Sequence, residues 1–97
     1  MLNINLKIGE RLDIGHPTGP ITVTLEKIKS CRVEIRVMRT GALPKFREIS
    51  PRDQVLVALN PRVVIMVRQI KRTGASFAYD ARDDIPIRRS TAKKRCA

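Results

Sequence analysis

The sequence lacks several residue types on which common functional sites depend. It has no Trp, one His and two Cys in 97 residues. Cys31 and Cys96 are too few and too far apart in the chain to supply a disulfide framework or a zinc site. His16 lies in a Pro/Gly-rich segment with no nucleophile motif beside it, and the chain contains neither a Gly-rich phosphate loop nor an HExxH pattern. We therefore expect no enzymatic activity, no metal and no cofactor.

Long apolar runs are also missing. No apolar stretch approaches the ~20 residues that span a bilayer. The N-terminal Met-Leu-Asn-Ile-Asn has neither the basic region nor the apolar run of a signal peptide. Together with the scarcity of cysteine, this pattern favours a cytoplasmic protein with no membrane partner.

Positive charge is what the chain has in excess. Twenty Lys and Arg residues stand against nine Asp and Glu, which gives a net charge of +11. Such an excess attracts polyanions and favours contacts with phosphate. Charge alone does not distinguish RNA from DNA, an acidic protein or an anionic membrane. For a small basic globular chain, nucleic acid is the first expectation.

Apolar and polar residues alternate along most of the chain, which is the pattern of half-buried β-strands. Because aromatic residues make up only 3% of the sequence, the core must be built from Val, Ile and Leu. Phe77 and Tyr79 are expected in the core rather than on a base-stacking surface, and Phe46 is the better surface candidate. The best helix candidate is one turn over 50–54, with Ser50 as N-cap. The alternation predicts strands over 4–8, 12–14, 21–28, 33–37, 55–59, 63–70 and 77–79.

The second half of the chain repeats the plan of the first. Few residues are identical, but strands that fill equivalent core positions must keep the same apolar register. We interpret the chain as two repeats, 1–49 and 53–91, that form a single compact domain over 1–91, followed by a basic flexible tail over 92–97. A shift of 42 residues places Ile21-Thr-Val-Thr-Leu over Val63-Val-Ile-Met-Val, Ile28-Lys29 over Ile70-Lys71, and Leu43-Pro44 over Ile85-Pro86.

The N-terminal segment MLNINLKIGERLDIG resembles the start of the carbon storage regulator family (CsrA/RsmA). That family begins with an apolar-polar strand, a basic pair, Val-Gly-Glu and a short strand that ends in Ile-Gly. In place of the basic pair this chain has Leu6-Lys7. The likeness continues through Ile21-Thr-Val-Thr, Ile28-Lys29, Arg32-Val-Glu-Ile and Leu43-Pro-Lys-Phe-Arg-Glu, and it returns over Asp80–Arg89.

The resemblance implies an all-β fold in which two five-stranded halves exchange their first and last strands. Family members are homodimers that bind GGA-containing RNA hairpin loops where the first strand of one subunit meets the fifth strand of the other. A tandem copy places both halves in one chain, as a strand-swapped pseudo-dimer of two small antiparallel sheets with little helix. The second repeat lacks a first strand, so we expect nine strands and one complete RNA edge, from 4–7 and 85–89. The other edge retains only 43–47.

By this resemblance the chain is an RNA-binding post-transcriptional regulator of messenger or small regulatory RNA, working as a pseudo-dimeric monomer or a homodimer. Arg47 and Arg89 close the two fifth strands and can stack on an unpaired base or present a planar fork to it. Cations from Arg88 to Arg95 are expected to add affinity independent of sequence. Two alternatives are a module that binds an acidic protein and a basic structural protein associated with RNA. The expected RNA-binding residues are Ile4, Asn5, Leu6, Lys7, Arg47, Ile85, Ile87, Arg88 and Arg89.

Overall fold

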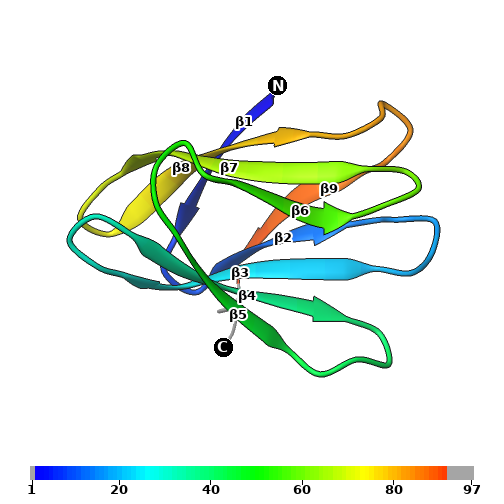
Figure 1. Cartoon of the computed structure of the whole chain (residues 1–97), viewed down its shortest axis with the longest axis horizontal. Coiled ribbons are helices and arrows are strands. Elements are labelled where there is room, and N and C mark those ends of the chain that lie inside the picture. Colours follow the sequence, from blue (N-terminus) through cyan, green and yellow to red (C-terminus); the bar gives the residue numbers. More distant parts are fainter. Residues whose placement is uncertain (1, 92–97) are drawn as a thin grey trace.

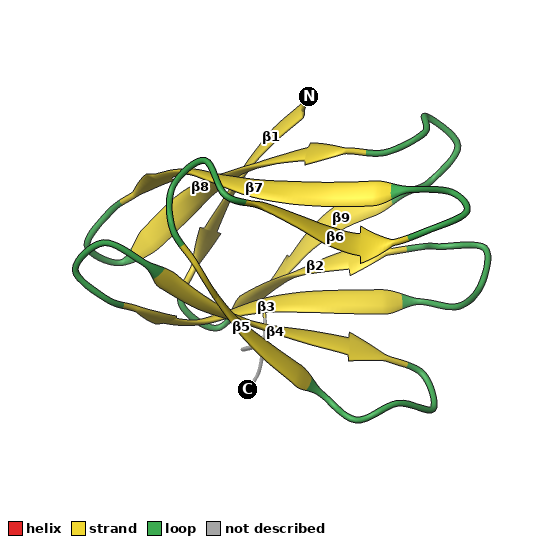
Figure 2. Ribbon diagram, in the orientation of Figure 1, coloured by secondary structure: helices red, strands yellow, loops and turns green. Residues whose placement is uncertain are grey.

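The computed structural model describes residues 2–91, which form nine strands and no helix (Figures 1 and 2). Within these residues there is accordingly no helix of a length and apolarity that could cross a membrane. The expected basic tail over 92–97 lies outside the described residues. The strands are β1 (Leu2–Lys7), β2 (Glu10–Ile14), β3 (Ile21–Ile28), β4 (Val33–Arg39), β5 (Lys45–Ile49), β6 (Gln54–Ala58), β7 (Val63–Ile70), β8 (Gly74–Asp80) and β9 (Ile87–Thr91).

The strands form two antiparallel sheets, as predicted. The four-stranded sheet has the order β1-β8-β7-β6, and the five-stranded sheet has the order β5-β4-β3-β2-β9. β1 belongs to the first repeat but pairs with β8 of the second, and β9 belongs to the second repeat but pairs with β2 of the first. The chain is therefore a strand-swapped pseudo-dimer, in which each half completes the other's sheet.

The offset of 42 residues that the sequence predicts is also the offset between the two halves of the structure. β3 and β7 are both eight residues long, and they begin at Ile21 and Val63. Each contains one irregularity in its pairing, and the residues skipped there, Glu26 and Arg68, are 42 positions apart as well. A shared bulge means that the two strands bend at the same place. β3 and β7 are thus equivalent in local geometry as well as in apolar register.

One strand does not follow the exchange that the family resemblance implies. β5 pairs with β4 of its own repeat, and not with β6 of the other. The place beside β8 is taken by β1, so β9 must pair elsewhere and joins β2. No strand takes the corresponding place beside β4, because the second repeat has no first strand. The short connection over 40–44 then lets β5 fold back on β4 as a hairpin.

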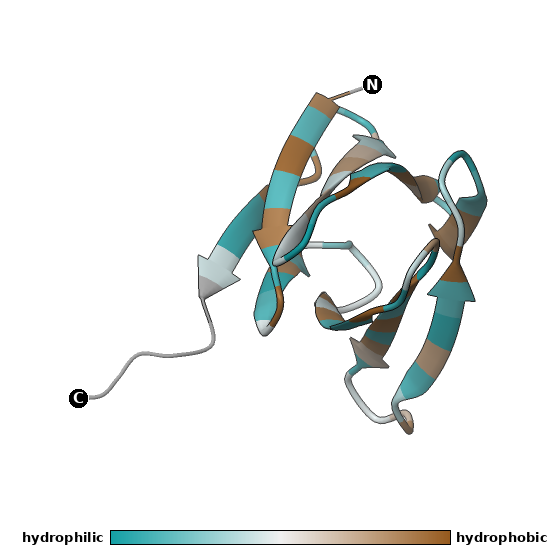
Figure 3. Ribbon diagram, turned by 90° about the vertical axis from the view of Figure 1, so that its left-hand side faces the viewer, coloured by the Kyte–Doolittle hydropathy of each residue, from teal (hydrophilic) through white to brown (hydrophobic). Residues whose placement is uncertain are grey.

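The core lies between the two sheets and is aliphatic, as expected. Strands in Figure 3 alternate between hydrophobic and hydrophilic residues, with the period of two that places successive side chains on opposite faces. Phe77 is fully buried, Tyr79 packs half-buried against the core, and Phe46 is 57% exposed, all as predicted. Alternation over 55–59 predicts that Leu59 faces inward with Val55 and Val57, but Leu59 is exposed, because a register shift between Leu56 and Ala58 ends the alternation before it.

His16 joins the two repeats. Its side chain is buried, with Nε2 2.8 Å from the carbonyl oxygen of Pro61 and Nδ1 2.7 Å from the hydroxyl of Thr18. A carbonyl can only accept, so Nε2 carries the proton that is donated to Pro61. Nδ1 then accepts from Thr18, whose backbone N–H is 3.2 Å away. This histidine has a structural task, which is to tie the loop after β2 to the turn between β6 and β7.

The segment 50–54 forms a turn rather than a turn of helix. The backbone N–H of Asp53 donates to the carbonyl of Ser50 at 3.0 Å, and the N–H of Ser50 donates to the Asp53 carboxylate at 3.1 Å. The chain therefore reverses within these residues and enters β6 directly. The Val-rich sequence that follows favours a strand over continued helix.

Candidate nucleic-acid interface

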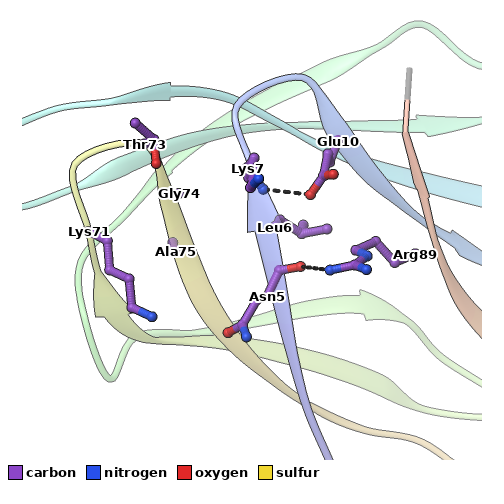
Figure 4. Close-up of a pocket in the computed structure, with 9 residues that line it drawn as sticks. All are labelled: Asn5, Leu6, Lys7, Glu10, Lys71, Thr73, Gly74, Ala75 and Arg89. Carbon is purple, nitrogen blue, oxygen red and sulfur yellow. Dashed lines mark hydrogen bonds between the residues drawn. The ribbon is translucent and has the colours of Figure 1, made fainter. Parts of the chain in front are cut away.

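The structure brings together the two segments from which the complete RNA edge was predicted. β1 is the edge strand of one sheet and β9 is the edge strand of the other. Arg89 Nη1 of β9 donates to the carbonyl oxygen of Asn5 in β1 at 3.4 Å (Figure 4). We refer to residues 4–7 and 87–89, where the two edges meet, as the β1–β9 seam.

The two arginines of β9 point to different sides of the sheet. Arg89 lies opposite Leu12, whose side chain is buried, so both side chains are on the inner face. From that face, at the rim of the sandwich, the Arg89 guanidinium reaches β1. Arg88 lies opposite Asp13 on the outer face. In the sequence these neighbours are equivalent cations, but in the structure only the side chain of Arg89 points to the seam.

Only alternate residues of β1 present backbone groups to the seam. The carbonyl of Asn5 accepts from Arg89, and the N–H of Lys7 donates to Glu10 Oε1 at 2.8 Å. Neither partner belongs to β8, so Asn5 and Lys7 face away from that strand. The direction of the backbone N–H and C=O groups alternates along a strand, so those of Ile4 and Leu6 point to β8. The structure thereby narrows the edge predicted over 4–7 to Asn5 and Lys7.

β1 is held in place by a close approach to Gly74. A Cβ built on Gly74 would lie 2.4 Å from the carbonyl oxygen of Leu6, a separation that atoms do not reach. Glycine is therefore required for β8 to lie this close to β1. On the outer face, the Ser76 hydroxyl donates to Asn5 Oδ1 at 2.7 Å. Together with the β1–β8 pairing, these two contacts fix the position of the Asn5 backbone relative to Arg89.

A pocket of about 280 Å³ opens along the seam (Figure 4). Three of the residues that line it are cationic: Lys7, Lys71 and Arg89. The one acid, Glu10, is buried, and its carboxylate is already engaged with a backbone N–H. The pocket therefore presents net positive charge beside the backbone edge of β1. Its full lining is Asn5, Leu6, Lys7, Glu10, Lys71, Thr73, Gly74, Ala75 and Arg89.

Sequence reasoning did not identify the residues that the turn between β7 and β8 contributes to this pocket. Lys71 and Thr73 lie in that turn, where the Lys71 N–H donates to the carbonyl of Gly74 at 2.8 Å. The only signal in the sequence for Lys71 was its positive charge. Its position beside the seam depends on β1 pairing with β8, which no local pattern encodes.

The apolar residues predicted at the site serve the core. The side chains of Leu6 and Ile85 are buried, and those of Ile4 and Ile87 are half-buried and packed against the core. The Ile85 N–H also donates to the carbonyl of Arg82 at 3.0 Å, in the turn before β9. Their contribution to the seam is to anchor its strands.

Arg47 is not part of the seam. β5 lies beside β4, at the edge of the five-stranded sheet opposite to β9. Arg47 is exposed there and faces no counterpart of β1. The expectation that 43–47 would be exchanged to the other half is wrong, for the reason of connectivity given above.

Beside Arg47, Glu48 is engaged in a cluster of charges. Its carboxylate accepts a hydrogen bond from the Lys29 ammonium and lies 3.3 Å from Arg32 Nη1. The hydrogen bond from Lys29 and the attraction of its charge lower the pKa of Glu48. Desolvation acts in the opposite direction, and the charge of Arg32 adds the smallest lowering effect. Glu48 therefore offsets positive charge at this edge, whereas none of the salt bridges among residues 2–91 involves Arg89.

The described residues contain no group of three or more His, Cys, Asp or Glu side chains that could hold a metal ion. The likeness to the carbon storage regulators depends on the short motifs quoted above. No protein-family model, no curated protein and no solved structure matches this chain.

Proposed function

We propose that the chain binds single-stranded or hairpin-loop RNA at the β1–β9 seam and acts as a post-transcriptional regulator. The observation that carries this proposal is the position of the Arg89 guanidinium against the backbone edge of β1, in a pocket with three cations and no free acid. The net charge of +11 supplies the general attraction for a polyanion. The family resemblance supports a GGA-type loop as the target.

The seam offers the two kinds of contact that recognition of unpaired RNA needs. Bases splayed from a loop can form hydrogen bonds to the Asn5 backbone and to the Lys7 carbonyl, or stack on a planar guanidinium. Phosphates can be neutralised by Lys7 and Lys71, which positions the RNA without reading its sequence. Selectivity is thus assigned to the edge and to Arg89, and the salt-dependent part of the affinity to the lysines.

Arg89 is available to a ligand because its present contact is weak. A donor–acceptor distance of 3.4 Å exceeds the usual range for N–H···O hydrogen bonds. In an exposed position such a contact contributes no more than about 1 kcal/mol. A base edge or a phosphate can therefore displace Asn5 at little cost.

The test compares Arg89→Ala with Arg47→Ala. These residues occupy equivalent positions 42 apart in the two repeats, and both are exposed, but only Arg89 faces β1. An RNA hairpin is first selected from random pools at constant salt. Binding is then measured by fluorescence anisotropy, with scrambled loops as the comparison. We expect Arg89→Ala to weaken hairpin binding by roughly 10- to 100-fold, as for a lost charged hydrogen bond, and Arg47→Ala by less than about threefold, as for one exposed charge.

Other outcomes point to the other functions. Equal, small losses in both variants, with flat binding to all RNAs and a steep salt dependence, indicate a structural RNA-associated protein. No enrichment of any RNA, together with retention of an acidic protein after nuclease treatment, indicates a protein-interaction module. Lys71→Ala should weaken binding to all sequences alike and reduce the slope of log affinity against log salt by about 1.

A further inference from the structure

Among the strands of residues 2–91, β6 ends the four-stranded sheet and pairs only with β7. The equivalent strand of the first repeat is β2, which has β9 on the corresponding side. The counterpart of β9 is β5, but β5 has folded back on β4. The pseudo-symmetry of the molecule therefore leaves one strand position unfilled, beside β6.

The composition of β6 sets it apart from the other edges. Among the described strands, the edge strands β1, β5 and β9 each carry at least one Lys or Arg, whereas β6 reads Gln-Val-Leu-Val-Ala. Charged residues on an edge strand are a common means of preventing further pairing. β6 has no charged residue of its own, in a chain of which 30% of the residues are charged, and the charge near its edge is the Arg39 guanidinium, which donates to the Val57 carbonyl. Its outward-facing Leu56 is 50% exposed.

We propose that β6 pairs with the β6 of a second copy of this chain, antiparallel about a two-fold axis, so that two four-stranded sheets become one continuous sheet. In a two-fold contact, the start of β6 in one copy lies beside the end of β6 in the other copy. Asp53 precedes β6, and the Arg39 guanidinium donates to the carbonyl of Val57 near its other end. Antiparallel pairing brings the Asp53 carboxylate of one copy, which accepts from the Ser50 N–H, towards Arg39 of the other. Arg39 then releases the Val57 carbonyl to the partner strand, and the two Leu56 side chains meet on the outer face.

The size of the contact indicates weak association. A pair of five-residue strands buries much less than the roughly 1,600 Å² of a standard interface. Repulsion between two chains of net charge +11 opposes pairing, but at physiological salt it is screened beyond about 8 Å. We therefore expect a dimer that forms reversibly with rising concentration. β1 is the opposite edge of the same sheet, so a dimer leaves both seams free. The inference does not depend on RNA binding.

The experiment is sedimentation equilibrium of the whole, nuclease-treated chain at physiological salt, from about 10 μM to 1 mM, a range that covers weak interfaces. Leu56→Lys places a charge on the β6 edge, and Gln54→Lys does so at a second exposed position of the same strand. Leu43→Lys is the matched control, because Leu43 is 85% exposed in the loop before β5. Circular dichroism verifies the fold of each variant.

We expect the wild type to shift towards the dimer across this range. Both β6 variants should raise the dissociation constant at least about tenfold, since an edge lysine opposes pairing, and Leu43→Lys should leave it unchanged. A wild type that stays monomeric at 1 mM overturns the proposal. A dimer that Leu56→Lys and Gln54→Lys do not weaken overturns it as well.

Discussion

Replacing Gly74 by Ala tests whether close contact between β8 and β1 holds the exchanged strand in place. The new Cβ would lie 2.4 Å from the Leu6 carbonyl oxygen and 3.2 Å from Lys7 Cα. Both neighbours are backbone, so β1 must retreat by about 1 Å to restore ordinary van der Waals contact. Overpacking of this kind costs about 1–3 kcal/mol. Ala also restricts the unfolded chain, which returns about 0.4–1 kcal/mol.

The net expectation for Gly74→Ala is a loss of about 1–2 kcal/mol, or a Tm lower by roughly 5–15 °C for a domain of this size. Urea unfolding measures the stability, and amide hydrogen exchange locates the change. The β1 amides that bond to β8 should lose protection. Gly41→Ala is the control: nothing lies within 4 Å of its Cβ, and its φ of +78° costs about 1 kcal/mol without touching β1. A Gly74→Ala protein as stable as wild type, with unchanged exchange in β1, would refute the reasoning.

Two further predictions concern side-chain contacts. Lys29→Ala should raise the pKa of Glu48 towards its ordinary value, as followed by NMR titration of the carboxyl, because the bond from Lys29 is the main cause of the lowering. A lowered folded-state pKa means that the contact stabilises at neutral pH and is lost as the pH falls through that pKa, so wild type and variant should converge in acid; a difference that grows there would contradict this. His16→Ala should reduce the free energy of unfolding by about 1–3 kcal/mol, because the partly buried Pro61 carbonyl loses its donor. An unchanged urea midpoint would show that the bridge between the repeats contributes nothing.

The parts of the fold that could be predicted are those that local pattern controls. Period-two alternation identified seven of the nine strands, because a strand with one buried face must keep that period. The last strand of each repeat, β5 and β9, was expected from the family resemblance. The offset of 42 residues was visible for the same reason. Where alternation breaks, the prediction failed, as at Leu59 beyond the irregularity of β6.

Prediction of the candidate site was partial for a related reason. The family resemblance predicted that β1 lies near β9, and in the structure Arg89 donates a hydrogen bond to the Asn5 carbonyl. Pattern alone could not separate Arg89 from Arg88, since the face of a residue depends on which partner strand lies opposite. Nor could it find Lys71, which reaches the seam only because β1 lies beside β8.

The sequence by itself determined the class of fold, the strands and the faces that they bury, because these follow from the order of apolar and polar residues along the chain. The choice of neighbours was decided only in the tertiary structure. Two strands with equivalent patterns, β5 and β9, pair differently because β1 blocks one position and nothing blocks the other. Which strand occupies which sheet edge depends on the other strands of the chain. This competition places Arg47 and Arg89 at different edges, and within residues 2–91 it leaves no strand on the outer side of β6.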